Sequence, residues 1–197
     1  MDVAGRSGPV QCTDHSNQME SDVKRSLALL ALAPLLAAPL RAQADLNDLE
    51  MAHVAVTANN IDIRYAHLAL ALSENAAVRE FAETMIRDHS AVTGQVAALA
   101  QRLNVEAQDN AVSRQQLRDA ERTLADLSAL RGAAFDRRYV ENELAYHRAV
   151  NGIVADSFIP NIENAEVKRA FESALVVFRG HERHAARLAR SVSASGK

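Results

Sequence analysis

The stretch VREFAETMIRDHSAVTGQVAALAQRL, residues 78–103, decides the fold because apolar residues recur in it at alternating spacings of four and three. That spacing places them on one face of an α-helix. The series comprises Val78, Ala82, Met85, His89, Val92, Val96, Leu99 and Leu103. The sequence therefore predicts a long amphipathic helix that carries one histidine, His89, on the face that packs against other helices.

The composition of the whole chain favours helices and limits the class of protein. Of its 197 residues 48% are hydrophobic, and only 7 are Gly and 4 are Pro. This length and composition indicate one helical domain. The formal net charge of -3 comes from 22 basic and 25 acidic residues that are spread along the chain. Because no basic stripe is present to neutralise phosphates, nucleic acid is not expected as a partner.

Residues 1–44 are predicted to be a secretory signal peptide. Two basic residues precede an apolar run at residues 26–40, and the small residues of Ala42-Gln43-Ala44 predict cleavage after Ala44. The run is too short to span a membrane, which takes about 20 residues. The protein is therefore expected to be exported to the periplasm, without a transmembrane segment in the mature chain.

The polar segment before the apolar run is unusually long, and it leaves two start positions open. Translation begins either at Met1 or at Met19, in which case residues 1–18 result from the assigned start. Cys12 is the chain's single cysteine and lies before the predicted cleavage site. The mature chain would then have no disulfide and no thiolate ligand, which is compatible with an oxidising compartment.

The mature domain, residues 45–192, is predicted to contain four long helices, followed by a frayed tail at residues 193–197. Each helix carries an apolar stripe at helical spacing, and the four are expected at residues 45–73, 76–104, 133–158 and 164–192. The short turn between the first two forces an antiparallel hairpin. Pro160 is expected to end the third helix.

Residues 105–132 form a weaker pattern between the two halves of this domain. Ser113-Arg-Gln-Gln116 has the spacing of a capping box, and the leucines that follow predict a short helix. A link of this length can run from one end of the bundle to the other. The predicted fold is therefore all-α: a ferritin-like four-helix bundle with a long central crossover that contains a short extra helix.

Three histidines and two acidic residues are the candidate site. His147 and His181 lie within the stripes of the third and fourth helices, as His89 does in the second. Counting from the first turn places Asp62 and His89 about 3 Å apart along the bundle axis. Small neighbours leave room for the Asp62 carboxylate to reach inward, although a solvated surface aspartate is the alternative.

The depths of the later histidines agree less well with a common site. Counting from Pro160 places His181 deeper in the bundle than His147 by roughly 9 Å. Glu143 lies one turn from His147 and nearer to the depth of His181, so it is a candidate bridge between them. The candidate metal ligands are His89, His147, His181, Asp62 and Glu143.

Neutral imidazoles with carboxylates are good ligands for Zn, Cu or Fe, and helical bundles hold metals with side chains from separate helices. A di-iron carboxylate centre is poorly supported, because Glu should stand three residues before two of the histidines. Those positions hold Ile86, Leu144 and Phe178. The one literal match, Glu50-x-x-His53, stands alone at the start of the first helix.

The alternative is a hydrogen-bond network without metal. Buried histidines that bond to acidic or hydroxyl side chains across helices can fix packing register, and Asp62, Asp88, Glu143 and Tyr139 are available partners. His53, His67 and His184 are expected at the surface or rim, where His184 leaves a two-histidine contact with His181 open. No catalytic motif is present: the sequence has no Gly-x-Ser-x-Gly and no phosphate-binding glycine loop.

Four segments together carry a family resemblance: FAETMIRDH at residues 81–89, FDRRYV at residues 135–140, His147 and His181. They resemble the bacterial exported domain-of-unknown-function family 4142, and the resemblance covers nearly all of the mature chain. Members are often labelled outer-membrane proteins and are placed among ferritin-like folds, which implies export and association with the envelope. Such proteins commonly carry Glu in the first helix where this chain has Asp62, a shorter carboxylate that would weaken or shift ligation.

Two functions stay open. In the first, the chain is a non-enzymatic envelope, stress-associated or interaction protein that binds an unidentified envelope partner, and its interior histidines form a structural network. In the second, it is a ferritin-like protein that binds a divalent metal for storage, buffering or redox work. Neither hypothesis assigns a catalytic residue.

Overall fold

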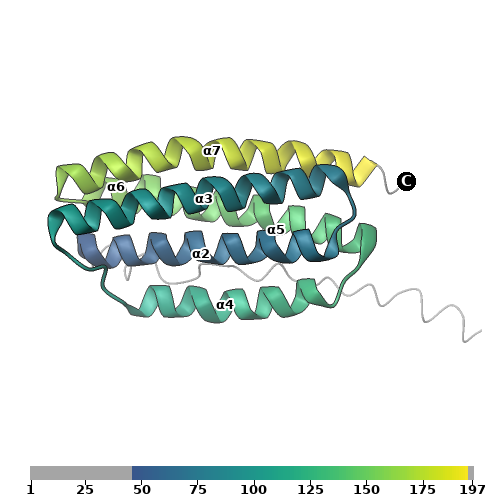
Figure 1. The fold of residues 1–197 in the computed structure, drawn as a ribbon, viewed down its shortest axis with the longest axis horizontal. Coiled ribbons are helices and arrows are strands. Elements are labelled where there is room, and N and C mark those ends of the chain that lie inside the picture. The colour runs from purple at the N-terminus through teal and green to yellow at the C-terminus, as the bar shows by residue number, and fades with distance from the viewer. Residues whose placement is uncertain (1–45, 195–197) are drawn as a thin grey trace, which may run out of the picture. The chain divides into compact units, whose positions relative to one another are not determined.

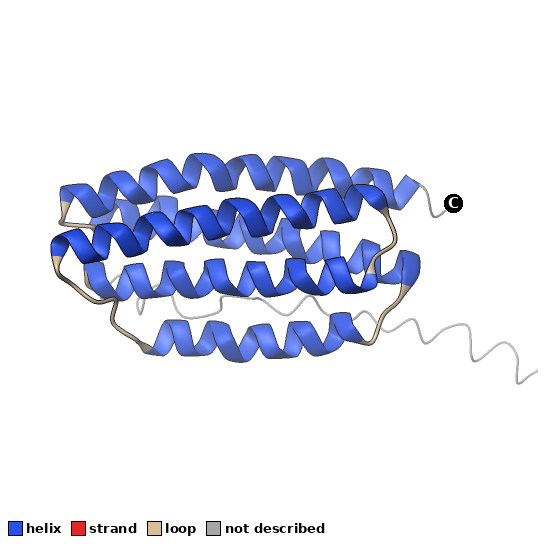
Figure 2. Ribbon diagram, in the orientation of Figure 1, coloured by secondary structure: helices blue, strands red, loops and turns tan. Residues whose placement is uncertain are grey.

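Residues 46–194 form the part of the chain that the computed structural model describes, and every regular element in this part is a helix (Figures 1 and 2). The predicted all-α class is therefore confirmed. The predicted signal peptide, its cleavage site, the two start positions and Cys12 lie outside the described residues, as do residues 195–197 of the predicted tail.

Two helices joined by a tight turn make the first half of the bundle. α2, Asp48–Leu72, begins after Asn47, whose side chain accepts hydrogen bonds from two backbone N–H groups of the first turn. The Glu50 carboxylate accepts in return from the Asn47 backbone N–H, which completes a capping box. α3, Ala76–Leu103, then runs back beside α2 (Figure 1). The Glu50 of the Glu50-x-x-His53 motif is thus accounted for by helix capping.

The second half of the bundle contains more helix before its turn than the sequence predicts. α5, Gly132–Ile153, continues into a π-helical turn, Val154–Phe158, and then into the short α6, Ile159–Asn161. The prediction that Pro160 ends this helix is wrong. Pro160 lies within α6, directly after the π-helical turn, and the helical backbone ends one residue later at Asn161. α7, Ala165–Ala194, returns along α5 and extends two residues past its predicted end.

The crossover contains α4, Ala111–Ser128, which lies against the outer side of α2 (Figure 1). The predicted start at Ser113 is wrong by three residues. Asn110 is the N-cap residue, and Ser113 occupies the third helical position, from which its hydroxyl accepts the Asn110 backbone N–H. Because α4 carries the chain back to the far end of the bundle, α3 and α5 run in the same direction. The predicted four-helix bundle with a helical crossover is therefore confirmed.

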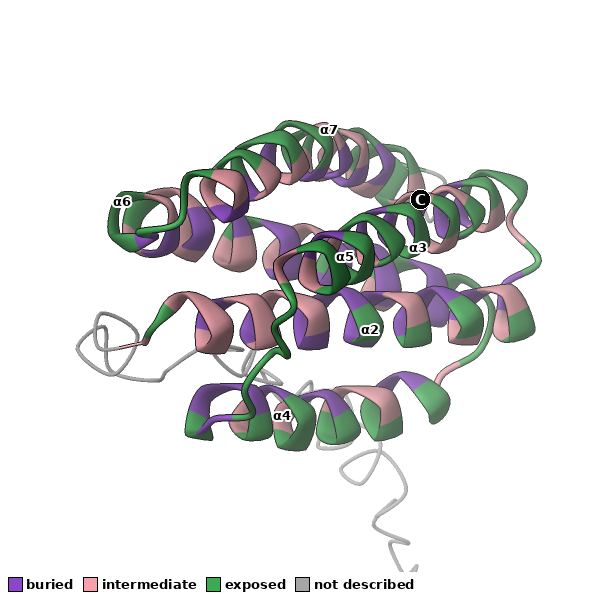
Figure 3. Cartoon of the chain, turned by 60° about the vertical axis from the view of Figure 1, so that its left-hand side comes forward, coloured by how far each residue is buried: buried purple, intermediate pink, exposed green. Residues whose placement is uncertain are grey.

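The helices turn their buried faces toward each other (Figure 3). Two apolar clusters fill the interior, and a layer of buried polar side chains lies at their border; in α3 and α7 this layer, at His89 and His181, separates residues of the two clusters. The first cluster includes Tyr65, Phe81, Met85, Phe135 and Tyr139. The second includes Met51, Leu99, Val154, Phe158 and Phe171. Each cluster excludes water from one side of the polar layer.

None of the helices between residues 46 and 194 is both long and apolar enough to cross a membrane.

Asn110 is expected to stabilise the crossover, because it caps α4 and its amide also donates to the backbone carbonyl of Glu50 in α2. Asn110→Ala should lower the free energy of unfolding by roughly 1–2 kcal/mol, measured by urea denaturation. The control is Leu117→Ala, which truncates an exposed side chain of the same helix. Equal losses in the two variants would contradict the capping role.

Candidate metal centre

All four long helices contribute to one buried cluster of ionisable side chains. Asp62 comes from α2, His89 from α3, Glu143 and His147 from α5, and His181 from α7. None of the five is more than 4% exposed. The structure therefore brings together every candidate ligand that the sequence analysis named.

The rings of His147 and His181 lie with their centroids 5.5 Å apart, so the expected depth difference of roughly 9 Å is wrong. Counted from the observed helix ends at Asn161 and Ala165, the two residues lie at similar depths. Helical side chains also lean toward the N-terminus of their own helix. Because α5 and α7 are antiparallel, the two histidines lean toward each other.

Asp62 stands between two of the histidines. Its Oδ2 atom lies 3.5 Å from His89 Nε2 and also 3.5 Å from His147 Nε2. The predicted meeting of Asp62 and His89 is confirmed, and a surface position for Asp62 is excluded because its side chain is completely buried. These separations exceed those of a good hydrogen bond. They are close to the spacing of about 3.4 Å between neighbouring ligand atoms that lie 2.0–2.1 Å from a tetrahedral metal.

Each histidine is oriented by a hydrogen bond from its other ring nitrogen. His147 Nδ1 donates to the backbone carbonyl of Glu143 at 2.9 Å, and His89 Nδ1 donates to the side-chain carbonyl of Asn59 at 2.9 Å. His181 uses the opposite nitrogen: Nε2 donates to the Asp88 carboxylate at 3.0 Å. These bonds fix the tautomer of each neutral ring.

In this arrangement each of the three histidine rings keeps one nitrogen whose lone pair accepts no hydrogen bond from a described residue. They belong to His89 Nε2, His147 Nε2 and His181 Nδ1, and these atoms are buried without a hydrogen-bond partner among the described residues. Ligand nitrogens of the three rings lie within 4.8 Å of one another. Histidines that bind metals in proteins commonly show this pattern, in which the second ring nitrogen donates to a carboxylate or carbonyl group.

Burial sets the charge of these groups. It lowers the pKa of His147 to about 4, despite an opposing hydrogen bond to the Glu143 backbone, and it lowers the pKa of His89 well below its ordinary value. The pKa of His181 is also lowered, mainly by burial, with a smaller opposing effect of Asp88. All three imidazoles are therefore neutral near pH 7, which is the form that binds metal ions.

Burial acts on the carboxyl groups in the opposite direction. It raises the pKa of Asp62 to about 8. It also raises the pKa of Glu143 well above its ordinary value, and the nearby Asp62 charge adds to this rise. Glu143 Oε2 lies 3.8 Å from His147 Nδ1. Asp62, Glu143 and His147 thus form a second group of potential ligand atoms, which shares His147 with the three-histidine group.

Some neighbours of the cluster were predicted and others were missed. Asp88 was named as a possible partner and does bond to His181. Asn59 was missed, because an asparagine on a helix has no pattern that distinguishes an inward from an outward position. Phe178 was named only as the residue three positions before His181, yet its ring stacks on His89 with centroids 4.5 Å apart.

The remaining histidines of the described segment lie outside the cluster. His67 is exposed and His53 is half-buried, as predicted. His184 packs edge-on against Phe81, with ring centroids 5.1 Å apart. The ring nitrogen of His181 that faces outward is bonded to Asp88, so the two-histidine contact considered from the sequence gains no support.

Comparison with known proteins gives one match. A family model described as a domain of unknown function (DUF4142) matches residues 33–188, which include all the candidate ligands. No curated protein and no solved structure matches the chain significantly.

The buried carboxyl group of Asp62 is expected to destabilise the metal-free protein as the pH rises. Its pKa is about 8 in the folded chain against an ordinary value of 3.8, so between these values the unfolded chain releases a proton that the folded chain retains. Asp62→Asn removes this titration. In chelator-treated protein it should raise the free energy of unfolding at pH 8 by an amount on the order of a few kcal/mol, and much less at pH 4.

Asp136→Asn is the matched control for this measurement. Asp136 is also a buried aspartate, but its carboxylate accepts a hydrogen bond from the Ser73 hydroxyl at 2.5 Å. The control should lower stability or leave it unchanged. A loss of stability in Asp62→Asn at pH 8 would show that Asp62 has a stabilising partner and would contradict the assignment.

Proposed function

The chain belongs to the family of the domain of unknown function DUF4142, and we propose that the centre of its bundle binds one divalent transition metal. The observation that carries the proposal is the convergence of three buried histidines from α3, α5 and α7, each with an unpartnered ring nitrogen among the described residues, with the Asp62 carboxylate beside two of them. Nitrogen ligands with a carboxylate oxygen suit Zn, Cu and Fe.

The charge of the interior supports the same proposal. Asp62 and Glu143 are both completely buried, and buried carboxylates are stable only when they are neutralised or paired. The three histidines are neutral near pH 7 and bring no compensating charge. A divalent cation would balance both carboxylates, so metal binding should release protons from the site and should strengthen as the pH rises.

The alternative hypothesis, a hydrogen-bond network without metal, explains the same residues less completely. It accounts for the bonds of Asn59, Asp88 and the Glu143 carbonyl to the three rings. It leaves both Asp62 oxygens and the three imidazole lone pairs without hydrogen bonds among the residues described. Each unsatisfied buried group costs about 1–3 kcal/mol. A metal ion would satisfy several of these atoms at once.

The cellular location of the proposed metal binding is inferred from the sequence. The predicted signal peptide places the protein in the periplasm, where a cysteine-free set of nitrogen and oxygen ligands is insensitive to disulfide chemistry. The proposed role is storage or buffering of a metal ion, or redox work by the bound ion, in a protein associated with the envelope.

Metal content gives a direct test. Protein prepared without an affinity tag, loaded with Zn²⁺ and desalted should retain about one ion per chain, because three imidazoles converge in one buried group. His89→Ala and His147→Ala should lose it, because each removes a nitrogen ligand. The control is His67→Ala, which removes an exposed histidine of α2. Metal content would be measured by mass spectrometry of the elements.

Bound zinc should also raise the temperature of unfolding of the native sequence and of His67→Ala, but not of His89→Ala. Native protein that retains no Zn²⁺, Cu²⁺ or Fe²⁺ after loading would contradict the proposal and would favour the structural network.

The residues that orient the imidazoles should tune the affinity. Asn59→Ala removes the acceptor of His89 Nδ1 and should weaken zinc binding by about 10–100-fold in competition titrations with a chromophoric chelator. Asn60→Ala is a matched control, since the neighbouring asparagine is exposed. Equal affinities for the two variants would show that Asn59 does not position His89.

A further inference from the structure

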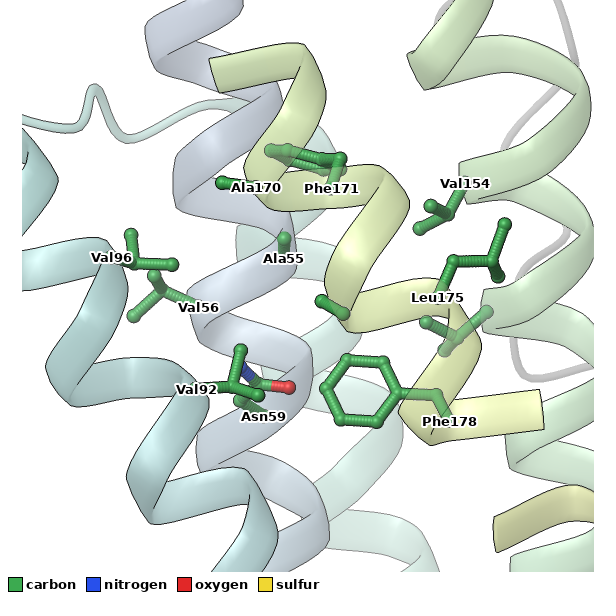
Figure 4. Close-up of a pocket in the computed structure, with 12 residues that line it drawn as sticks. Ala55, Val56, Asn59, Val92, Val96, Val154, Ala170, Phe171, Leu175 and Phe178 are labelled. Atoms are coloured by element: carbon green, nitrogen blue, oxygen red, sulfur yellow. The ribbon is translucent and has the colours of Figure 1, made fainter. Parts of the chain in front are cut away.

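An apolar cavity lies in the seam between the two helical hairpins, next to the proposed metal centre (Figure 4). It measures about 460 Å³, including space that is open to solvent, and α2, α3, α7 and the α5 to η1 segment all line it. Eleven of the twelve lining residues are Ala, Val, Leu or Phe. The twelfth is Asn59, whose side-chain carbonyl accepts the hydrogen bond from His89.

A second cavity lies between this apolar space and the candidate ligands. This smaller cavity of about 220 Å³ is lined by Asp62, His89 and His147, and it shares Asn59, Val150 and Phe178 with the larger one. The Phe178 ring points toward Asn59 and Val92 in Figure 4 and stacks on His89. Phe178 therefore forms a wall between the apolar space and the imidazole cluster.

The apolar space also continues away from the cluster. A third cavity, of about 440 Å³, shares Val96, Ala170 and Phe171 with the first and extends along α3 to Leu103. The three cavities follow one another from the end of the bundle to its polar centre, and each shares lining residues with the next. Nearly all of this route is hydrocarbon, which disfavours ions and strongly hydrated molecules but accommodates apolar guests.

We propose that this seam admits an uncharged diatomic gas molecule of the size and polarity of dioxygen or nitric oxide, which reaches the bound metal past Phe178. The proposal rests on the metal centre proposed above. The hydrocarbon lining of the seam offers water almost no polar partners, so small apolar guests are accommodated there more readily than polar ones. Three imidazoles supply three ligands to a metal that takes four, so a fourth position could be open to such a molecule.

The first arm of the test needs no metal. Xenon is an apolar probe of similar size, and its binding is followed by NMR chemical-shift changes in chelator-treated protein at increasing xenon pressure. The shifts should be confined to residues such as Val92, Val96 and Leu175. Ala174→Leu fills the cavity and should abolish them, whereas Ala98→Leu makes the same change at an exposed position of α3 and should not.

The second arm uses Fe²⁺-loaded protein and nitric oxide, whose iron complex is detected by absorbance and electron paramagnetic resonance. Ala174→Leu should slow formation of the complex by roughly tenfold, which corresponds to about 1.4 kcal/mol in the activation free energy. Ala98→Leu should match the native protein. The iron content of each variant is measured first, so that a slower reaction is not mistaken for lost metal.

The outcomes separate the two proposals. Absence of xenon binding, or equal nitric oxide rates in the native protein and Ala174→Leu, overturns the route through the seam even if the metal is retained. Native protein that holds no iron or other tested metal overturns the metal centre and with it the coordination of a gas. Xenon binding in that case would assign the cavity to an apolar guest that does not meet a metal.

Discussion

The structure depends on one costly arrangement: a layer of neutral imidazoles and carboxyl groups enclosed by apolar side chains on both sides. Asp62 is completely buried within 3.5 Å of two histidine nitrogens, and neither of its oxygens has a hydrogen-bond donor in the described segment. Packing alone would be served better by apolar residues of similar size. Four helices nevertheless converge there, and each of the three histidines is held in place by a hydrogen bond from its second ring nitrogen. The cost of this layer favours the proposed metal binding over a purely structural role.

The sequence allowed the helices and most of the site to be predicted, because both follow from periodicity. Apolar stripes determined which faces turn inward, and the short turn after α2 fixed the levels of Asp62 and His89 closely enough to predict their contact. The direction of side chains was not part of that counting. For this reason the sequence overestimates the separation of His147 and His181 along the bundle axis, although each side chain leans toward the other.

Features that depend on local hydrogen bonding were harder to predict. Asn59 carries the bond that orients His89, yet its neighbour Asn60 is exposed and has the same chemistry. The π-helical turn at Val154–Phe158 shifts the register of the third long helix, and nothing in its composition distinguishes it from an ordinary turn. Asn110 and Ser113 both satisfy capping rules, and only the folded backbone selects Asn110.

The candidate ligands are divided between the two hairpins, and this division determines when the proposed site can form. Neither the α2 and α3 pair nor the α5 and α7 pair contains the full ligand set, so the complete site arises only when the hairpins dock. A chain threaded unfolded through a secretion channel would carry no ion with it. Loading of the proposed site would then draw on the metal supply of the destination compartment, and the cytoplasmic pool would not decide which element could occupy it.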